Sequence, residues 1–240
     1  MHTVLLYTTM AKTIREIPVL FENNFCLVLN KPPGLSVQGG AGIKTSLDSI
    51  LSEEVTPRPF LVHRLDRDTS GIILVAKTLE AAREFSFLFE GNKAGSQKIT
   101  RQYKGVCLGK LETSHGTIKL DLDVHGAKKE SKTNFRTLSA SVCRIDNADL
   151  DFSFLELELL TGRMHQIRRH LALSGHPLLG DDKYGNFPLN RKLKKLKGIT
   201  NLLLYASRLV IPPLQFIPSG LDVSAPIPDY FSRLPFTFAV

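Results

Sequence analysis

The stretch HRLDRDTSG, residues 63–71, places five ionisable side chains directly before the apolar run 72–76. Its carboxylate Asp66 is two residues from Arg64, so both side chains point to the same side of an extended chain. A nearby guanidinium favours the ionised carboxylate, which makes Asp66 a persistent anion. Such a group can act as a nucleophile, stabilise a developing cation or form a salt bridge. The pair alone favours the salt bridge, but its position before an apolar strand favours a site.

A second cluster, TGRMHQIRRH, covers residues 161–170. We expect a helix over residues 163–174, with Arg163 in its first turn beside Gly162. A helix N-terminus next to an arginine binds anions readily. The alternative is an ordinary solvated basic face, which would also include Arg168 and Arg169. Three apolar residues of this helix should share the face toward the core: Met164, Ile167 and Leu171.

No metal site is expected. His165 and His170 are five residues apart, so they do not share one helical face, and no cysteine or carboxylate spacing completes a ligand set. The three cysteines are far apart and form no CxxC pair. We therefore expect neither a zinc site nor a disulfide, and a reducing cytoplasm as the compartment.

Basic residues dominate the charge of the chain. There are 31 Lys and Arg residues against 23 Asp and Glu, a net charge of +8. Such an excess indicates an anionic partner, with nucleic acid first and a membrane surface second. No stretch approaches the roughly 18 apolar residues that cross a bilayer.

The segment RKLKKLKG, residues 191–198, is the densest basic run. Taken alone it is more typical of a solvated surface, but beside the net charge it suggests phosphate contacts through Lys192, Lys194 and Lys195. Tyr103 lies among basic residues in RQYKG and could stack on a base, although a lone strand tyrosine more often only packs.

The elements that must position these residues alternate irregularly. We expect strands over residues 72–77, 102–108, 152–160, 202–210 and 234–239. Helices are expected over residues 46–52, 78–89 with Thr78 as N-cap, and 163–174. Strands outnumber helices without strict alternation. This predicts an α+β fold with a central mixed, largely antiparallel sheet, flanking helices and a cleft.

Five stretches of the sequence resemble the RluA-type family of RNA pseudouridine synthases. They occur in the family's order and together cover roughly residues 18–215. The most specific are HRLDRDTSGIILVAK (63–77) and LLTGRMHQIRRHLALSGHPLLGDDKYG (159–185). The others are LNKPPGLSVQGG (29–40), YKGVC (103–107) and LLLYASRLVIPP (202–213).

The resemblance implies a specific chemistry. Members of this family replace the N1–C1′ bond of a uridine with a C5–C1′ bond and need no cofactor. Their essential aspartate corresponds to Asp66, and their stacking tyrosine corresponds to Tyr103. The resemblance also implies that Arg163 pairs with Asp66, and that Arg64 fills the space left by the flipped nucleotide. Whether Asp66 attacks C1′ or removes a proton from C2′ is left open.

The expected partner is a stem-loop of rRNA or tRNA, bound by a monomer. The residues expected to contact RNA are His63, Arg64, Arg67, Arg168, Arg169, Lys192, Lys194 and Lys195. We divide the chain into an N-terminal extension, residues 1–17, and a catalytic domain, residues 18–240. Some relatives begin with an S4 RNA-binding module. The 17 residues before Pro18 are too few for one, so we expect a short form.

Two other functions compete with this interpretation. One is a non-catalytic RNA-binding or ribosome-assembly protein, which would have no need for Asp66 facing anionic RNA. The other is a hydrolase that uses Asp66 to cleave a glycosidic bond, which would release free uracil and leave an abasic site.

Overall fold

The computed structural model describes residues 11–91, 93–94, 97–124 and 126–234. Its helices are α1 (Leu47–Glu54), α2 (Leu79–Phe89), α3 (Gln166–Leu173) and α4 (Phe187–Lys197), with short 3-10 segments at Ile14–Glu16 and Asp229–Arg233. The strands are β1 (Val19–Glu22), β2 (Cys26–Lys31), β3 (Phe60–Leu61), β4 (Ser70–Ala76), β5 (Lys93–Ala94), β6 (Gln97–Lys98), β7 (Thr100–Leu108), β8 (His115–Lys119), β9 (Leu122–Val124), β10 (Ala127–Lys129), β11 (Lys132–Ile145), β12 (Ala148–Leu159), β13 (Leu204–Ile211) and β14 (Leu221–Ser224).

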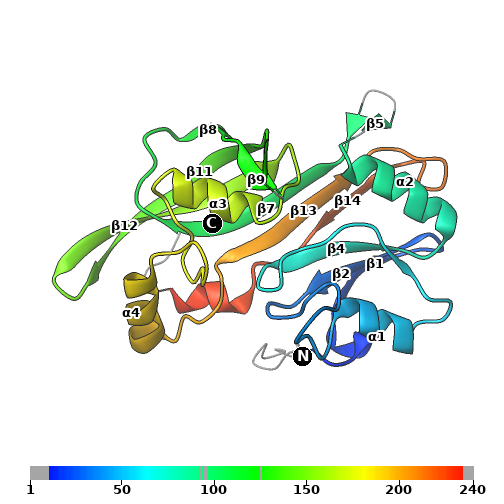
Figure 1. Ribbon diagram of the computed structural model, residues 1–240, viewed down its shortest axis with the longest axis horizontal. Coiled ribbons are helices and arrows are strands. Elements are labelled where there is room, and N and C mark those ends of the chain that lie inside the picture. Colours follow the sequence, from blue (N-terminus) through cyan, green and yellow to red (C-terminus); the bar gives the residue numbers. More distant parts are fainter. Residues whose placement is uncertain (1–10, 92, 95–96, 125, 235–240) are drawn as a thin grey trace.

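One ten-stranded sheet runs through the molecule (Figure 1). Its main order is β1-β2-β4-β13-β7-β12-β11-β8, while β3 pairs with β4 and β14 with β13. Within the described residues, the pairing of β4 with β13 is parallel, and the other pairings in this sheet are antiparallel. The expected α+β fold with a mixed, largely antiparallel sheet is confirmed.

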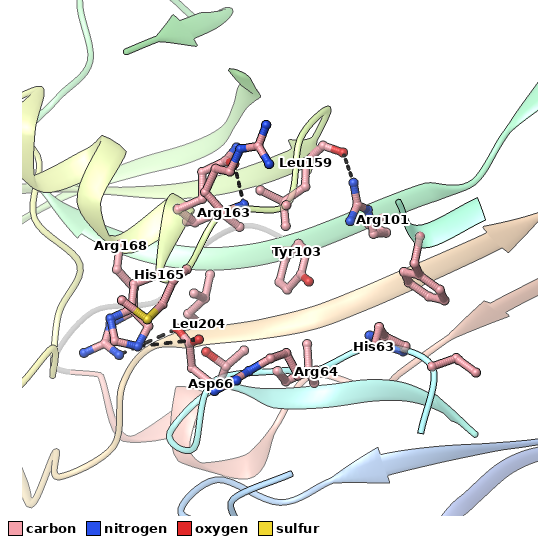
Figure 2. Close-up of a pocket in the computed structure, with 18 of the residues that line it drawn as sticks. His63, Arg64, Asp66, Arg101, Tyr103, Leu159, Arg163, His165, Arg168 and Leu204 are labelled. Atoms are coloured by element: carbon pink, nitrogen blue, oxygen red, sulfur yellow. Dashed lines mark hydrogen bonds and ion pairs between the residues drawn. The ribbon is translucent and has the colours of Figure 1, made fainter. Parts of the chain in front are cut away.

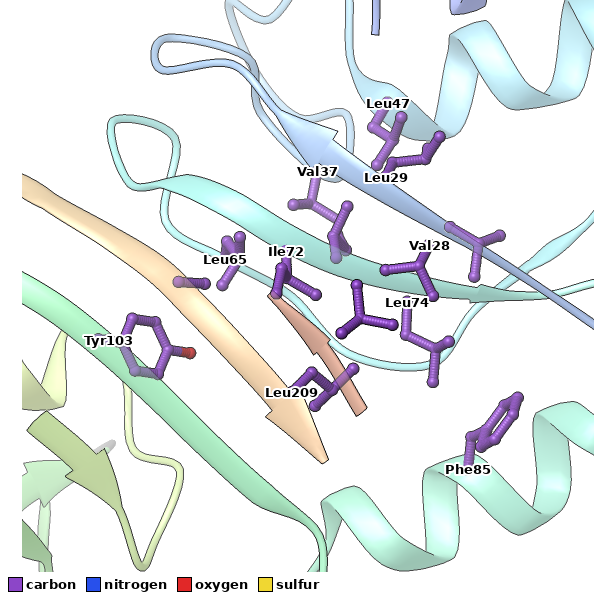
Figure 3. Packing of buried hydrophobic residues seen from close by; sticks show 14 of the residues in the cluster. Val28, Leu29, Val37, Leu47, Leu65, Ile72, Leu74, Phe85, Tyr103 and Leu209 are labelled. Atoms are coloured by element: carbon purple, nitrogen blue, oxygen red, sulfur yellow. The ribbon is translucent and has the colours of Figure 1, made fainter. Parts of the chain in front are cut away.

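Strand β4 is the most deeply buried strand of the sheet. All seven of its residues, SGIILVA, are buried, as expected for an apolar run covered on both faces. In Figure 3, Ile72 and Leu74 of β4 lie among side chains from β2, β13 and α2. The loop that carries Asp66 therefore leads into one of the most rigidly held parts of the core.

Both faces of the sheet are covered, because successive side chains of a strand point to opposite faces. In β12, Leu155 and Leu157 belong to the main apolar cluster, whereas Phe152 and Phe154 belong to a second cluster that includes Leu193 of α4. This alternation agrees with the pattern in the sequence. On the face that carries the main cluster the sheet borders a cavity, which Leu65 and Tyr103 of that cluster line.

Local sequence explains where most helices begin. Thr78 caps α2 by accepting a hydrogen bond from the Ala81 N–H, as expected. Ser46 and Ser49 form a reciprocal capping box at α1. Asn186 caps α4, which ends at Gly198 in the left-handed conformation.

Three expectations have other outcomes. Helix α3 begins at Gln166 and not at Arg163, because His165 takes the left-handed conformation with φ 54°. The strand expected over 234–239 lies, apart from Leu234, outside the described residues. The division at residue 18 stays a prediction, although Ala11 and Ile17 are buried in the main core.

Candidate active site

A cavity of about 600 Å³ opens above the sheet where β4, β13 and β7 lie side by side. Its walls come from the loop before β4, the end of α2, strand β7, and the segment from Leu159 to α3 (Figure 2). Six of the residues expected to act in catalysis or in RNA binding line it: His63, Arg64, Asp66, Tyr103, Arg163 and Arg168. Segments far apart in the chain thus converge on one space.

Asp66 is partly accessible in this cavity, with 21% of its side chain exposed. Its Oδ2 lies 3.7 Å from Arg168 Nη1, and its Oδ1 lies 3.8 Å from His165 Nε2. These distances are longer than direct hydrogen bonds, so the carboxylate oxygens remain available to a third group.

Arg168 is held by two further carboxylates. Its Nε and Nη2 donate to Asp181 at 2.8 and 2.7 Å, and Nη2 also donates to Asp182 at 3.0 Å. Both Arg168 and Asp181 are buried. Burial alone would lower the pKa of Arg168, but hydrogen bonds and charge from Asp181 outweigh it and raise that pKa. Arg168 is thus a fixed cation beside Asp66.

His165 is the second neighbour of Asp66. Burial is the main cause that lowers the pKa of His165; the charge of Asp66 opposes this shift, and the charge of Arg168 adds to it. The Nδ1 atom of His165 lies 3.0 Å from the Tyr184 hydroxyl, which fixes the ring. With its pKa lowered, His165 is a neutral imidazole at neutral pH, and it lies beside Asp66.

Tyr103 and Arg101 project from the same face of β7, two residues apart. Burial raises the pKa of Tyr103 to about 12, so its phenol stays protonated at neutral pH. The Arg101 Nη2 donates to the Leu159 carbonyl at 3.3 Å, and burial lowers the pKa of this guanidinium. Figure 2 shows Tyr103 between Asp66 and Arg101.

Lys31, at the end of β2, connects the loop that follows it, rich in proline and glycine, to the loop that carries Asp66. Its Nζ is fully buried and donates to the carbonyls of Pro32, Leu35 and Arg67 at 2.9, 2.9 and 3.0 Å. Burial lowers the pKa of Lys31 to about 7. Because the third carbonyl follows Asp66 by one residue, Lys31 fixes the backbone that carries the carboxylate.

The structure contradicts the expected pairing of Arg163 with Asp66. Arg163 is exposed, and its Nε donates to the Glu130 carbonyl at 3.4 Å. Because α3 begins only at Gln166, Arg163 lies in the preceding loop, and Arg168 of α3 is the arginine that lies beside Asp66. Met164, expected in the core, is 58% exposed for the same reason.

Two of the expected RNA contacts, Arg168 and His63, present no accessible cation, and their contact with RNA stays a prediction. Arg168 is buried and paired with carboxylates, so it has no accessible charge for a phosphate. His63 accepts a hydrogen bond from the Leu74 N–H at 2.9 Å and stacks on Phe89. Burial, followed by the charge of Arg101, lowers the pKa of His63 to about 3, so the His63 ring is uncharged at neutral pH.

Three other arginines remain candidates for RNA contact. Arg64 is exposed at the cavity and makes no ion pair within the part of the chain that the structure describes. Arg67 is exposed beside Asp68 and Asp182. Arg169 is half-buried, and its Nη1 donates to the Asp123 carbonyl at 3.0 Å.

The basic residues of α4 lie outside the cavity. Lys194 and Lys195 are exposed, and Lys192 pairs with Asp146 at 2.6 Å. Leu189 and Leu193 hold the helix on the second cluster. The described residues contain no group of three or more His, Cys, Asp or Glu placed to hold a metal ion. Nor does any described helix have the length and apolarity to cross a membrane.

Sequence reasoning missed Asp181, Tyr184 and Lys31 as parts of this site. The paired acids of GDDKYG follow an apolar run, which signals a carboxylate at a buried edge. Their partner Arg168 could not be identified from spacing alone. Lys31 gave a weaker signal, as a lysine at the end of an apolar strand.

Comparisons with known proteins were made for the sequence and for the fold. The profile of the family described as RNA pseudouridylate synthase matches residues 25–173. The ribosomal large subunit pseudouridine synthase D of Yersinia pestis is 35% identical over 218 residues, which cover 81% of this chain and 63% of the relative. The enzyme of the same name from Haemophilus influenzae is 34% identical and covers 90% of this chain and 69% of its own. RNA pseudouridine synthase 4, mitochondrial, of Arabidopsis thaliana is 37% identical and covers 70% of this chain and 40% of its own.

The solved structures agree on the fold. The human RNA pseudouridylate synthase domain containing 4 has a TM-score of 0.70 at 22% identity, with 90% of each chain covered. The human domain containing 1 has a TM-score of 0.64 at 24% identity, covering 88% of this chain and 83% of its own. The chain spans less than two thirds of two of the curated relatives named above. Since the family profile covers more than half of its length and a relative 34% identical is covered over more than two thirds, the protein belongs to the RNA pseudouridylate synthase family.

Proposed function

We propose that this protein is an RNA pseudouridine synthase that isomerises uridine in a stem-loop of rRNA or tRNA. The observation that carries the proposal is Asp66, a partly accessible carboxylate held by Arg168 and His165 in a cavity that also contains Tyr103. A carboxylate that faces anionic RNA weakens RNA binding by charge repulsion, so its presence in the cavity favours a role in the reaction. The buried cation beside it offsets part of that repulsion.

The chemistry follows from these groups. A uridine must leave its stack to reach Asp66, which costs a few kcal/mol. Stacking on Tyr103 and insertion of Arg64 into the vacated space would offset that cost. Asp66 then either attacks C1′ and releases the uracil anion, or removes a proton from C2′ to give a glycal. In both routes the uracil turns and C5 bonds to C1′; this displaces the Asp66 carboxylate in the first route, and in the second C2′ takes back its proton. The C5 proton is then lost and N1 is protonated.

Large-subunit rRNA is the first RNA to test, because relatives from Yersinia and Haemophilus bear that substrate in their names. The basic surface of α4 and the exposed arginines at the cavity fit a phosphate backbone. We place the protein in the cytoplasm as a monomer. Oligomeric state is read by light scattering.

The decisive experiment measures tritium release from C5-labelled uridine in separate pools of rRNA and tRNA. Wild type should release tritium, whereas Asp66→Asn should lose at least about 10³-fold in rate, on the scale at which chemical groups contribute to catalysis. RNA affinity of the variant should stay within a few-fold. Asp48→Asn, an exposed carboxylate of α1 paired with Arg58, is the control and should keep the wild-type rate.

Each competing function predicts a different result. No tritium release with intact RNA binding would favour the assembly protein. Free uracil together with abasic sites would identify a hydrolase. Undiminished release by Asp66→Asn would overturn the role of this residue.

A further inference from the structure

Arg101 is a partly buried cation whose position the proposed reaction does not use. It lies at the cavity between β7 and the Leu159 end of β12, where Nη2 binds the Leu159 carbonyl. A Cβ built on Gly162 would lie 3.0 Å from Nη1, so a side chain at residue 162 would require the guanidinium to shift.

Its hydrogen-bonding capacity is largely unused. The buried Nε of Arg101 has no partner among the described residues, and the guanidinium has no carboxylate within 4 Å among them. The adjacent ring of His63 is neutral, so it offers the Arg101 guanidinium no negative charge. Because an unsatisfied buried donor destabilises the folded protein, its retention calls for an explanation.

The position of Arg101 in the cavity determines which part of a bound nucleotide it can contact. Asp66 must face the sugar, and Figure 2 places Tyr103 between Asp66 and Arg101. A base stacked on Tyr103 with its sugar at Asp66 would direct its far edge toward Arg101. Phosphates, by contrast, remain at the mouth, where Arg64 and Arg163 are exposed.

We propose that Arg101 donates hydrogen bonds to the O4 edge of the extruded uracil and thereby makes the site select uracil over cytosine. This inference rests on the proposed function. A guanidinium has five donors and no acceptor. Uracil presents a carbonyl acceptor at C4, whereas cytosine presents an amino donor there, so cytosine would leave both groups unpaired.

The test compares the affinities of hexamers of uridylate and cytidylate by fluorescence anisotropy. Single strands need no base flipping and no turnover. Wild type should bind the uridylate hexamer on the order of 10-fold more tightly, the scale of one charged hydrogen bond. In Arg101→Met that ratio should fall to about one. Arg101→Gln, which offers both a donor and an acceptor, should also lose the preference.

Arg136→Met is the matched control. Arg136 is an exposed arginine of β11 that pairs with Glu156 and does not line the cavity. It should leave the ratio unchanged. Equal affinity of wild type for both hexamers, or a preference that survives in both Arg101 variants, overturns the proposal. An equal loss of affinity for both hexamers with a smaller salt slope would assign Arg101 to phosphate and also overturn it.

Failure of the proposed function gives a different signature. Uracil preference that depends on Arg101, without any pseudouridine in rRNA or tRNA, would support base selection and refute the isomerase.

Discussion

Arg168 joins two carboxylates of very different exposure. It binds the buried Asp181 through two hydrogen bonds and lies 3.7 Å from the partly accessible Asp66. One guanidinium therefore fixes the loop after α3 and the candidate catalytic anion together. Removing a single member would leave a buried charge without its partner.

Replacing Arg168 by methionine should lower the free energy of unfolding by about 3–5 kcal/mol, because Asp181 then remains buried without a counter-charge. Urea denaturation followed by circular dichroism measures this change. The matched control is Arg163→Met, an exposed arginine that binds one carbonyl. Its effect should stay within about 0.5 kcal/mol, as for most surface substitutions. Equal losses in the two variants would contradict the assignment of the buried pair.

The sequence predicted part of this constellation. Asp66 and Tyr103 both line the cavity, because dense charge before an apolar strand and an aromatic among basic residues are visible locally. The arginine beside Asp66 was misplaced by five positions. Nothing in GRMHQIRR indicates that His165 is left-handed, so no local signal shows that α3 begins after Arg163.

At the scale of elements, the contact between β4 and β13 sets the geometry beneath the cavity. Gly71 has φ 99°, and a Cβ built there would lie 2.2 Å from the Ala206 carbonyl oxygen. The two strands can therefore pair at this point only if residue 71 has no side chain.

Gly71→Ala should destabilise the protein by more than about 4 kcal/mol or prevent folding, because backbone atoms of β13 cannot yield. Gly91→Ala separates the clash from the strain, since Gly91 has φ 101° with no atom within 4 Å of the added Cβ. It should cost only about 1–2 kcal/mol. Thermal unfolding of both variants measures the difference. Similar melting temperatures would show that strain alone accounts for Gly71.

Elements with strong local signals were predicted to within a few residues. The capping residue Thr78 located α2, and alternation located β12. The short pairs β5–β6 and β9–β10 were not identified, since two or three residues carry no period. The parallel pairing of β4 with β13 was also invisible, because it joins segments with no local signal in common.

At the scale of the whole molecule, charge is distributed over separate surfaces. Helix α4 and helix α1 lie far apart in Figure 1. The cavity lies between the Asp66 loop and α3, and α4 follows α3 in the chain. Because no residue of α4 lines the cavity, an RNA bound at the cavity would have to extend beyond it to contact α4.

Replacing Lys192, Lys194 and Lys195 together by glutamine should reduce the salt dependence of RNA binding. Each lost phosphate contact lowers the slope of log affinity against log salt by about 0.7–0.9, so three contacts would lower it by about two. The control replaces Lys12, Lys44 and Arg58, three exposed basic residues near α1, by glutamine. An unchanged slope in the α4 variant would assign that helix to ordinary surface.

The parallel pairing has a consequence for biosynthesis. Ser70 of β4 pairs with Tyr205 of β13, which leaves the ribosome more than one hundred residues later. At typical elongation rates the nascent strand waits on the order of ten seconds for this neighbour. During that time the edge of β4 that faces β13 is paired only at Val75 and Ala76, by β3, and unpaired strand edges recruit other chains. The strand that supports the site therefore keeps an incompletely paired edge until β13 is synthesised.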